Sequence, residues 1–331
     1  MTAEQAHAGD ERVADVVAVV VVAYNSASVL PGLIASLPLG LDGVRWHLTV
    51  VDNASADDST DVVRRLAPTA LVVETGRNGG YAAGINAGVA AAAPHTAVLV
   101  LNPDVRLGPG CGRELLAALR EPGTGIAVPR LTDGDGTLIT TMRREPSVLR
   151  ALGDALLGAR RAGRHALLGE VVTDVRRYEE PGICDWAEGS TQLVSGACWR
   201  RCAPWDESFF LYSEETDFAL RARDAGLVTR YVPAAVAVHL EGDSRTSPGL
   251  WALLTVNRVR LFGRRHGCAA TACYWAALLL REASRAVLGH SIAREAVRAL
   301  TSPSRLRETP GPASVVPRDR SRRGRQPARV A

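Results

Sequence analysis

Three acidic residues follow a run of aromatic residues in the segment FFLYSEETDFALRARDAG. Glu214, Glu215 and Asp217 fall in the first turn of a helix predicted over residues 214–225. Crowded carboxylates raise one another's pKa, and a raised pKa suits a general base. A structural interpretation is also open, because acids complement the positive end of a helix dipole and Asp217 can pair with Arg221 at i,i+4.

A further acid stands where a predicted buried strand ends. The strand VLVL runs directly into Asn102, a proline and Asp104. One carboxylate at this place, together with diphosphate oxygens and water, can hold Mg²⁺ or Mn²⁺. His239 ends a short Val-rich strand in VAVHLEGDSR and is a candidate nitrogen ligand for the same ion. Asn-Pro-Asp is also good turn chemistry, and a lone histidine is more often structural, so both interpretations stay open.

Asp52 ends another predicted strand, in the segment VDNASADDST. A carboxylate there can accept hydrogen bonds from the N–H of a nucleotide base or from a ribose hydroxyl. The same segment is equally typical of a turn and a helix start, for which Asn53, Ser55 and Asp57 are suitable residues.

The segment GRNGGYAAGINAG carries a glycine pair directly before a predicted helix. Gly79 and Gly80 permit a ligand to approach the backbone closely. The helix N-terminus favours anions, and Arg77 adds a cation beside it. The alternative is helix packing, because Gly84 and Gly88 lie at i,i+4 on one helix face.

Alternating strands and helices between residues 13 and 105 must position these groups. Continuous apolar runs predict strands buried on both faces, and segments of helical period lie between them. The order predicts an α/β protein with a Rossmann-like, mostly parallel central sheet and helices on both faces. Ligands bind at the carboxyl ends of such strands, where Asn25, Asp52 and Asp104 fall. The predicted strands are Val16–Ala23, Leu48–Val51, Ala70–Glu74 and Ala97–Leu101, and the predicted helices start near Asn25 or Ser26, near Ser55 and at about Tyr81.

The remaining chain predicts a second half, a helical region and a tail. Residues 106–245 continue the sheet, although residues 132–182 suggest an acceptor-side insertion or a mobile loop. Residues 246–300 predict two or three helices. Residues 301–331 hold eight Arg against two acids, which predicts a disordered basic tail. That tail has no aromatic residues to stack on bases, so nucleic-acid binding is not expected.

Composition indicates a folded protein and the cell compartment expected for it. Hydrophobic residues make up 47% of the 331, which is ample for a packed core. The six cysteines form no CxxC pair, and reduced thiols are typical of a cytosolic chain. No signal peptide or transmembrane run is visible, so we expect a cytoplasmic protein.

Taken together, six segments resemble the family 2 glycosyltransferases, most closely their rhamnosyltransferase-like branch. They span most of residues 16–245 in the order expected for the family. The resemblance implies a GT-A fold, with a catalytic domain over residues 13–245 made of a nucleotide-binding half (13–105) and a metal and acceptor half (106–245). It also implies inversion at the anomeric carbon. The segments are VVVVAYNSASVLPGLIASL, VDNASADDST, RNGGYAAGINAG, VLVLNPDV, VSGACWRRCAPWDESFFLYSEETDFALRARDAG and VHLEGDSR.

The resemblance also implies roles for single residues. Asp104 is similar to the last acid of the family's DxD metal motif, with Asn102 in place of the first acid, and His239 would be the second ligand of a divalent metal. Glu215 resembles the catalytic base, although Glu214 beside it competes for that role. The implied substrate-binding residues are Ala23, Tyr24, Asn25, Asp52, Asn53, Arg77, Asn78, Gly79, Asn86, Asn102 and Asp217, with Ser195, Gly196, Ala197 and Trp205 in acceptor-side loops.

The substrates that the branch implies are dTDP-L-rhamnose and a polyprenyl-diphosphate-linked or other glycan acceptor of the cell envelope. The aromatic, Arg-flanked helices of residues 251–288 could lie on the inner face of the plasma membrane, or simply pack on the domain. Another donor, such as a galactofuranose or hexosamine nucleotide, stays open. A nucleotidyltransferase would need a Gly-rich basic loop after Val22, where this chain has AYNSAS, and a non-catalytic sugar-nucleotide binder would not need the acids.

Overall fold

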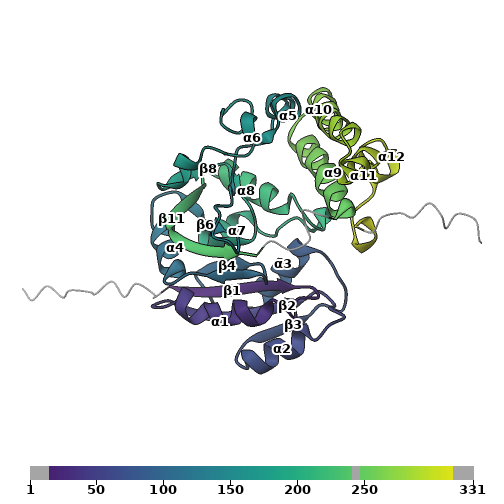
Figure 1. Cartoon of the computed structure of the whole chain (residues 1–331). Coiled ribbons are helices and arrows are strands. Elements are labelled where there is room, and N and C mark those ends of the chain that lie inside the picture. The colour runs from purple at the N-terminus through teal and green to yellow at the C-terminus, as the bar shows by residue number, and fades with distance from the viewer. Residues whose placement is uncertain (1–14, 241–246, 316–331) are drawn as a thin grey trace, which may run out of the picture.

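The computed structural model describes residues 15–240 and 247–315 (Figure 1). Its first half contains four parallel strands in the order β3-β2-β1-β4. β1 and β4 are apolar runs buried along almost their whole length, whereas β2 is buried only in its second part. Two of the four strands have the bounds that the sequence predicts, since β1 covers Val16–Ala23 and β4 covers Ala97–Leu101, whereas β2 covers Arg45–Asp52 and β3 covers Leu71–Glu74.

The second half continues the sheet with mixed strand directions. Strand β10 (Thr191–Ser195) runs antiparallel to both β4 and β6 (Thr124–Thr132). Strand β11 (Val228–His239) is parallel to β6 and antiparallel to β5 (Val105–Leu107) and β8 (Gly182–Cys184). A register shift between Val232 and Val236 makes β11 irregular along its length. Within the described ranges, nine strands form this sheet, and β7 (Met142–Arg143) pairs with β9 (Trp186–Ala187) beside it.

Helices cover both faces of the sheet, as predicted. The apolar residues of α1 (Leu30–Gly40), α2 (Ser59–Leu66) and α4 (Cys111–Leu119) belong to one core. Those of α3 (Tyr81–Ala91), α7 (Gly196–Cys202) and α8 (Glu214–Asp224) belong to the other. The predicted start of the first helix at Asn25 or Ser26 is wrong, because Asn25 adopts a left-handed φ of 52° and its side chain accepts a hydrogen bond from the N–H of Ala56 instead.

Helix α3 lies directly on the sheet because it lacks side chains at two positions. A Cβ atom at Gly84 would lie 2.6 Å from a methyl carbon of Val22, and one at Gly88 would lie 2.5 Å from a methyl carbon of Val20. Real Cβ atoms do not approach so closely, so these glycines are packing residues, as the structural interpretation of the segment predicts.

The C-terminal helices form a separate layer beside the second half of the sheet (Figure 1). They are α9 (Pro248–Arg265), α10 (Cys268–Val287) and α11 (Ser291–Leu300). Residues 132–182 are partly helical rather than a plain loop, and α5 (Val148–Leu157), which is followed by the short α6 (Ala159–Ala162), packs on α10. A buried ion pair between Arg258 and Glu170 ties this region to α9.

The disordered tail predicted from residue 301 is wrong for its first part. Residues Pro303–Arg307 form helix α12, which Ser302 caps by accepting a hydrogen bond from the N–H of Arg305. Arg260 of α9 holds the same segment by donating to the carbonyl of Arg305 at 2.7 Å. These contacts order the chain where composition alone predicted disorder, while residues 316–331 lie outside the described residues.

Neither described range contains a helix that is long and apolar enough to cross a membrane. The aromatic residues of the C-terminal helices point inward rather than to a surface. Tyr274 is fully buried and stacks on Phe262, and the indole N–H groups of Trp251 and Trp275 donate to Glu282 and to the carbonyl of Leu300. The packing interpretation is therefore correct for these aromatic residues.

Candidate active site

The ends of the parallel strands bring the predicted polar residues to one edge of the sheet. Ala23 at the end of β1 pairs with Asp52 at the end of β2, and Asn102 directly follows β4 on the other side of β1. Parallel strands deliver their carboxyl ends to the same edge, so the sequence pattern was sufficient to predict this grouping.

Asp104 and His239 meet at this edge although 135 residues separate them. Strand β5 pairs antiparallel with the end of β11, and His239 lies opposite Val105, the residue after Asp104. The Nε2 atom of His239 lies 3.3 Å from Oδ1 of Asp104, with side chains 13% and 18% exposed. A carboxylate and an imidazole at this spacing suit a shared divalent cation.

The pair fits a metal that the substrate helps to hold. Within the described ranges, no three His, Cys, Asp or Glu side chains lie close enough together to enclose a metal ion. Mg²⁺ and similar ions are commonly bound by one or two protein ligands together with substrate phosphates and water. Asp104 and His239 therefore supply the protein's part of such a site.

The two adjacent glutamates have different environments. Glu214 is only 2% exposed, and burial together with the charge of Glu215 raises the pKa of its carboxyl well above the usual value. Glu215 keeps partial access to solvent, and burial, followed by the charge of Glu188, raises its pKa to about 7. A group with a pKa near neutrality and access to substrate suits a general base, whereas Glu214 stays protonated and enclosed.

Tyr81 shows that the base candidate and the metal pair share one site. Burial raises the pKa of its phenol, and electrostatic interactions with the carboxyl groups of Glu214, Glu215 and Asp104 raise it further. The phenol donates a hydrogen bond to the carbonyl of Gly189 at 3.1 Å. The acids of the two sequence segments thus surround a single side chain at the N-terminus of α3.

A strained turn leads into the two glutamates. Phe210, Tyr212 and Ser213 have φ values of 64°, 70° and 78°, in the region that disfavours side chains. Each such residue costs about 1–3 kcal/mol and persists only where neighbours hold it, and such strain is common at functional sites. Helix α8 begins immediately after this turn, so the turn sets the direction in which Glu215 leaves the backbone.

Asp52 retains one carboxylate oxygen for a ligand. Its Oδ2 accepts a hydrogen bond from the N–H of Ser55 at 3.1 Å. Its Oδ1 is buried and bonds to no atom of the described residues. A buried acceptor of this kind is costly unless a partner arrives, so it fits the N–H of a base or a ribose hydroxyl.

The neighbours of Asp52 divide into structural and exposed residues. Asn53 is buried and its side-chain amide donates to the carbonyl of Gly80 at 2.9 Å, which joins the second segment to the third. Ala23 is also buried, and its carbonyl accepts the N–H of Asn53. Tyr24, at 51% exposed, lies open beside them and leaves its ring available to a ligand.

One glycine of the pair, Gly80, is required by the packing of the protein's own backbone. A Cβ atom on Gly80 would lie 2.1 Å from the carbonyl oxygen of Phe210, so the close approach comes from the protein's own backbone. Asn78 holds the turn by accepting the N–H of Gly80, whereas Gly79 and the exposed Arg77 border the open side.

Three residues predicted for an acceptor-side loop lie elsewhere, and that part of the prediction is wrong. Strand β10 runs antiparallel to β4, so Ser195 pairs with Ala97 at the start of β4. Gly196 and Ala197 follow in α7, with the N–H of Gly196 bonded to the carbonyl of Thr96. At about 3.3 Å per residue, these residues are roughly 13 Å from the edge that carries Asp104.

Asn86, Trp205 and Asp217 have structural contacts. The Asn86 amide donates to the carbonyl of Trp205 and accepts its N–H, and the buried Trp205 ring stacks on Phe218 at 5.1 Å. Asp217 pairs with Arg221 at 2.7 Å, as the structural interpretation of the acidic cluster predicts. These contacts join α3, α8 and the segment between α7 and α8.

The residues at the beginning of β10 lie at the candidate site, unlike those at its end. The carbonyl of Ser190 accepts the N–H of Asn102, and a Cβ atom on Gly189 would lie 3.1 Å from Cβ of Glu215. The antiparallel direction of β10, which local sequence patterns do not reveal, places Glu188, Gly189 and Ser190 at the site. The acid and the small residues in WAEGST were the only sequence signal.

The fold and the site suit a transferase that uses a nucleotide-sugar donor. Comparisons with known proteins agree with this class of enzyme. The profile described as Glycosyl transferase family 2 matches residues 18–171. An N-acetylglucosaminyl-diphospho-decaprenol L-rhamnosyltransferase of Mycobacterium tuberculosis H37Rv is 32% identical over 250 residues, which cover 70% of this chain and 78% of that protein. A low-salt glycan biosynthesis hexosyltransferase of Haloferax volcanii is 26% identical over 241 residues, covering 70% and 69%.

Solved structures agree on the fold. A mannosyltransferase from Pyrobaculum calidifontis, in complex with GDP-Man and Mn²⁺, matches with a TM-score of 0.54 and 17% identity, covering 88% of this chain and 82% of that one. The predicted GT-A architecture is therefore confirmed. The chain belongs to the family 2 glycosyltransferases, and it is a glycosyltransferase of the rhamnosyltransferase-like kind.

Proposed function

We propose that this protein is an inverting enzyme that transfers L-rhamnose from dTDP-L-rhamnose to a lipid-linked acceptor of the cell envelope. The observation that carries the proposal is a grouping at one end of the sheet, where Asp104 lies 3.3 Å from His239, and where Glu215 lies against Gly189, whose carbonyl accepts a hydrogen bond from the Tyr81 hydroxyl. A base and a metal pair on opposite sides of a donor are what a single displacement requires.

The nucleotide half holds the donor in this proposal. Asp52 accepts from the base or the ribose through its buried Oδ1, and the exposed Tyr24 and Asn25 border the same place. Asp104 and His239 would hold a divalent metal, Mg²⁺ or Mn²⁺, together with oxygens of the donor diphosphate. When bound, the metal offsets the negative charge that grows on the departing diphosphate. Arg77 adds a cation on the open side of the glycine turn.

Glu215 performs the proton transfer in this mechanism. Its carboxylate takes the proton of the acceptor hydroxyl while the oxygen attacks the anomeric carbon. The bond from that carbon to the diphosphate oxygen breaks in the same step, and the configuration inverts. Glu214 remains protonated beside it, so a second negative charge does not compete for the proton.

The choice of rhamnose and of a polyprenyl-linked acceptor rests on the mycobacterial relative, whose name specifies both. The test is transfer from a panel of nucleotide sugars to a synthetic N-acetylglucosaminyl-diphospho-polyprenol, with the product identified by mass spectrometry. We expect a deoxyhexose product from dTDP-L-rhamnose that requires Mn²⁺ or Mg²⁺. Product from only a galactofuranose or hexosamine nucleotide would refute the rhamnose donor, and no product from any donor would favour a non-catalytic binder.

A lipid-linked acceptor needs a membrane-facing surface, and we propose that α5, α6 and the end of α10 form it. Leu156 is 71% exposed, and at the end of α10 Val287 and Leu288 are 87% and 77% exposed. α5 packs on α10, so these apolar side chains belong to adjoining helices, and Figure 1 shows α5 between α6 and α10. Exposed arginines follow on and after α6, at Arg160, Arg161 and Arg164. Exposed leucines with neighbouring arginines suit an anionic membrane surface.

Replacing Leu156 with glutamate is expected to weaken binding to phosphatidylglycerol-containing vesicles by about tenfold or more, because burying one leucine contributes about 1.5–3 kcal/mol. Vesicle sedimentation of the full chain measures the effect. Leu39→Glu is the matched control. Leu39 is 59% exposed on α1, which packs on the sheet and not with α5 and α10. Equal vesicle binding by both variants and the parent chain would refute this surface.

A further inference from the structure

The turn of residues 209–213, which directly precedes Glu214 and Glu215, is held by hydrogen bonds from two sides. On one side, the N–H of Tyr81 donates to the carbonyl of Phe210 at 2.8 Å, and Gly80 leaves room for that carbonyl. On the other side lies Asn257 of α9, which is completely buried. No side chain within the turn provides these bonds, so the turn depends on residues far away in the sequence.

Asn257 makes an unusual set of contacts for one amide. Its Nδ2 atom lies 2.8 Å from the carbonyl oxygen of Phe209, 2.9 Å from that of Leu211 and 3.1 Å from that of Tyr212. An amide nitrogen has two N–H donors, so the three carbonyls share them. All three carbonyls belong to the segment in which Phe210, Tyr212 and Ser213 have positive φ. The amide therefore contacts the strained turn at three of its carbonyls.

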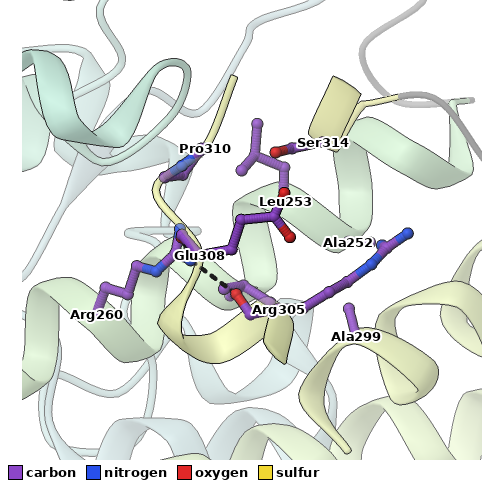
Figure 2. A pocket seen from close by; sticks show the side chains of 9 residues that line it. Ala252, Leu253, Arg260, Ala299, Arg305, Glu308, Pro310 and Ser314 are labelled. Carbon is purple, nitrogen blue, oxygen red and sulfur yellow. Dashed lines mark hydrogen bonds between the residues drawn. The ribbon is translucent and has the colours of Figure 1, made fainter. Parts of the chain in front are cut away.

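The orientation of Asn257 is fixed by a second link. Arg260 donates to Oδ1 of Asn257 at 3.0 Å, which leaves Nδ2 directed at the turn. Arg260 also donates to the carbonyl oxygens of Arg305 and Glu308 in the C-terminal segment. Figure 2 shows Arg260 reaching from α9 to this segment, next to a small groove of about 20 Å³. The C-terminal segment is thereby connected to the turn through Arg260 and Asn257.

We infer that Asn257 is a positioning residue for the catalytic base, and that Arg260 and the segment of residues 303–308 hold it in place. The inference rests on the proposed role of Glu215. Glu215 is the second residue of α8, which begins where the turn ends, so a change in the turn moves its carboxylate. A displacement of about 1 Å at a reacting group costs about 10²-fold in rate.

The test compares three variants of the full chain in the transfer assay, with the donor that the parent chain uses. Asn257→Asp keeps the shape of the side chain but replaces the N–H donors with an oxygen that faces three carbonyls. We expect its kcat to fall about 10²-fold while the KM for the donor changes less than threefold, since the donor pocket lies on the other half. Arg260→Gln should lower kcat less, because Asn257 keeps its donors.

Thr255→Val is the matched control. Thr255 is also buried on α9, but its hydroxyl donates only to the carbonyl of Trp251 in the same helix. We expect kcat within threefold of the parent chain. A general disturbance of α9 would lower kcat in this variant too, which would overturn the specific role of Asn257.

Amide hydrogen exchange separates local positioning from global unfolding. We expect faster exchange at residues 209–217 in Arg260→Gln than in the parent chain, with unchanged exchange in β1 and β4. This measurement decides the matter even where Asn257→Asp does not fold. Parent-like kcat in a folded Asn257→Asp, or parent-like exchange in Arg260→Gln, would overturn the inference. Full activity of Glu215→Gln would instead refute the proposed base, whatever the Asn257 variants do.

Discussion

Replacing Glu215 with glutamine is expected to lower kcat by about 10²–10⁴-fold, the usual contribution of a positioned general base. Glutamine keeps the size of the side chain but cannot accept the proton of the acceptor hydroxyl. The pKa of about 7 also predicts the pH dependence. The base works only when ionised, so kcat/KM of the parent chain should rise about tenfold per pH unit below pH 7 and level off above it.

Glu214→Gln is the informative comparison. The raised pKa of Glu214 favours the protonated form of this carboxyl, and a protonated carboxyl and an amide have similar shape and charge. We expect a loss of less than tenfold. The folded state holds a proton there that the unfolded chain releases as pH rises, which costs stability above the ordinary glutamate pKa. Glu214→Gln should therefore raise Tm at neutral pH. A large loss in Glu214→Gln with full activity in Glu215→Gln would reverse the assignment.

The second large effect concerns the metal pair. With dTDP and Mn²⁺ both at about 100 times their dissociation constants, bound ligand adds about 2.7 kcal/mol or more to the free energy of unfolding. That corresponds to a rise in Tm of about 4 °C for a protein of this size. Asp104→Asn removes the charged ligand beside His239, so we expect dTDP to stabilise this variant equally with and without Mn²⁺. Thermal unfolding of the purified chain measures both effects.

Two variants control for charge and for the loss of an imidazole. Asp135→Asn removes an exposed acid from the turn after β6, and His47→Gln removes a histidine near the start of β2, at the opposite edge of the sheet. Both should keep the Mn²⁺-dependent stabilisation, whereas His239→Gln should lose most of it. A Mn²⁺ effect that survives in Asp104→Asn would mean that the metal binds elsewhere.

The predicted strands were accurate where the chain is apolar for many residues in a row. Val16–Ala23 and Ala97–Leu101 have the predicted bounds because a strand buried on both faces tolerates few polar residues. The grouping of Asp52, Asn102 and Asp104 was also predictable, since parallel strands end at one edge. The boundaries of elements in polar stretches were predicted less accurately. The first helix begins at Leu30 rather than near Asn25, because the side chain of Asn25 bonds to the neighbouring loop.

The fold class follows from local patterns of apolar and polar residues, whereas the family and the acids that can do chemistry follow from the resemblance of six segments in order. Only the tertiary structure decided which residues meet. The antiparallel direction of β10 moved Ser195 away from the site and brought Gly189 to it. The contact between Asn257 and the turn before Glu215 joins residues more than 40 positions apart, and local sequence cannot show it. Burial, which also depends on the whole fold, distinguishes Glu215 from Glu214.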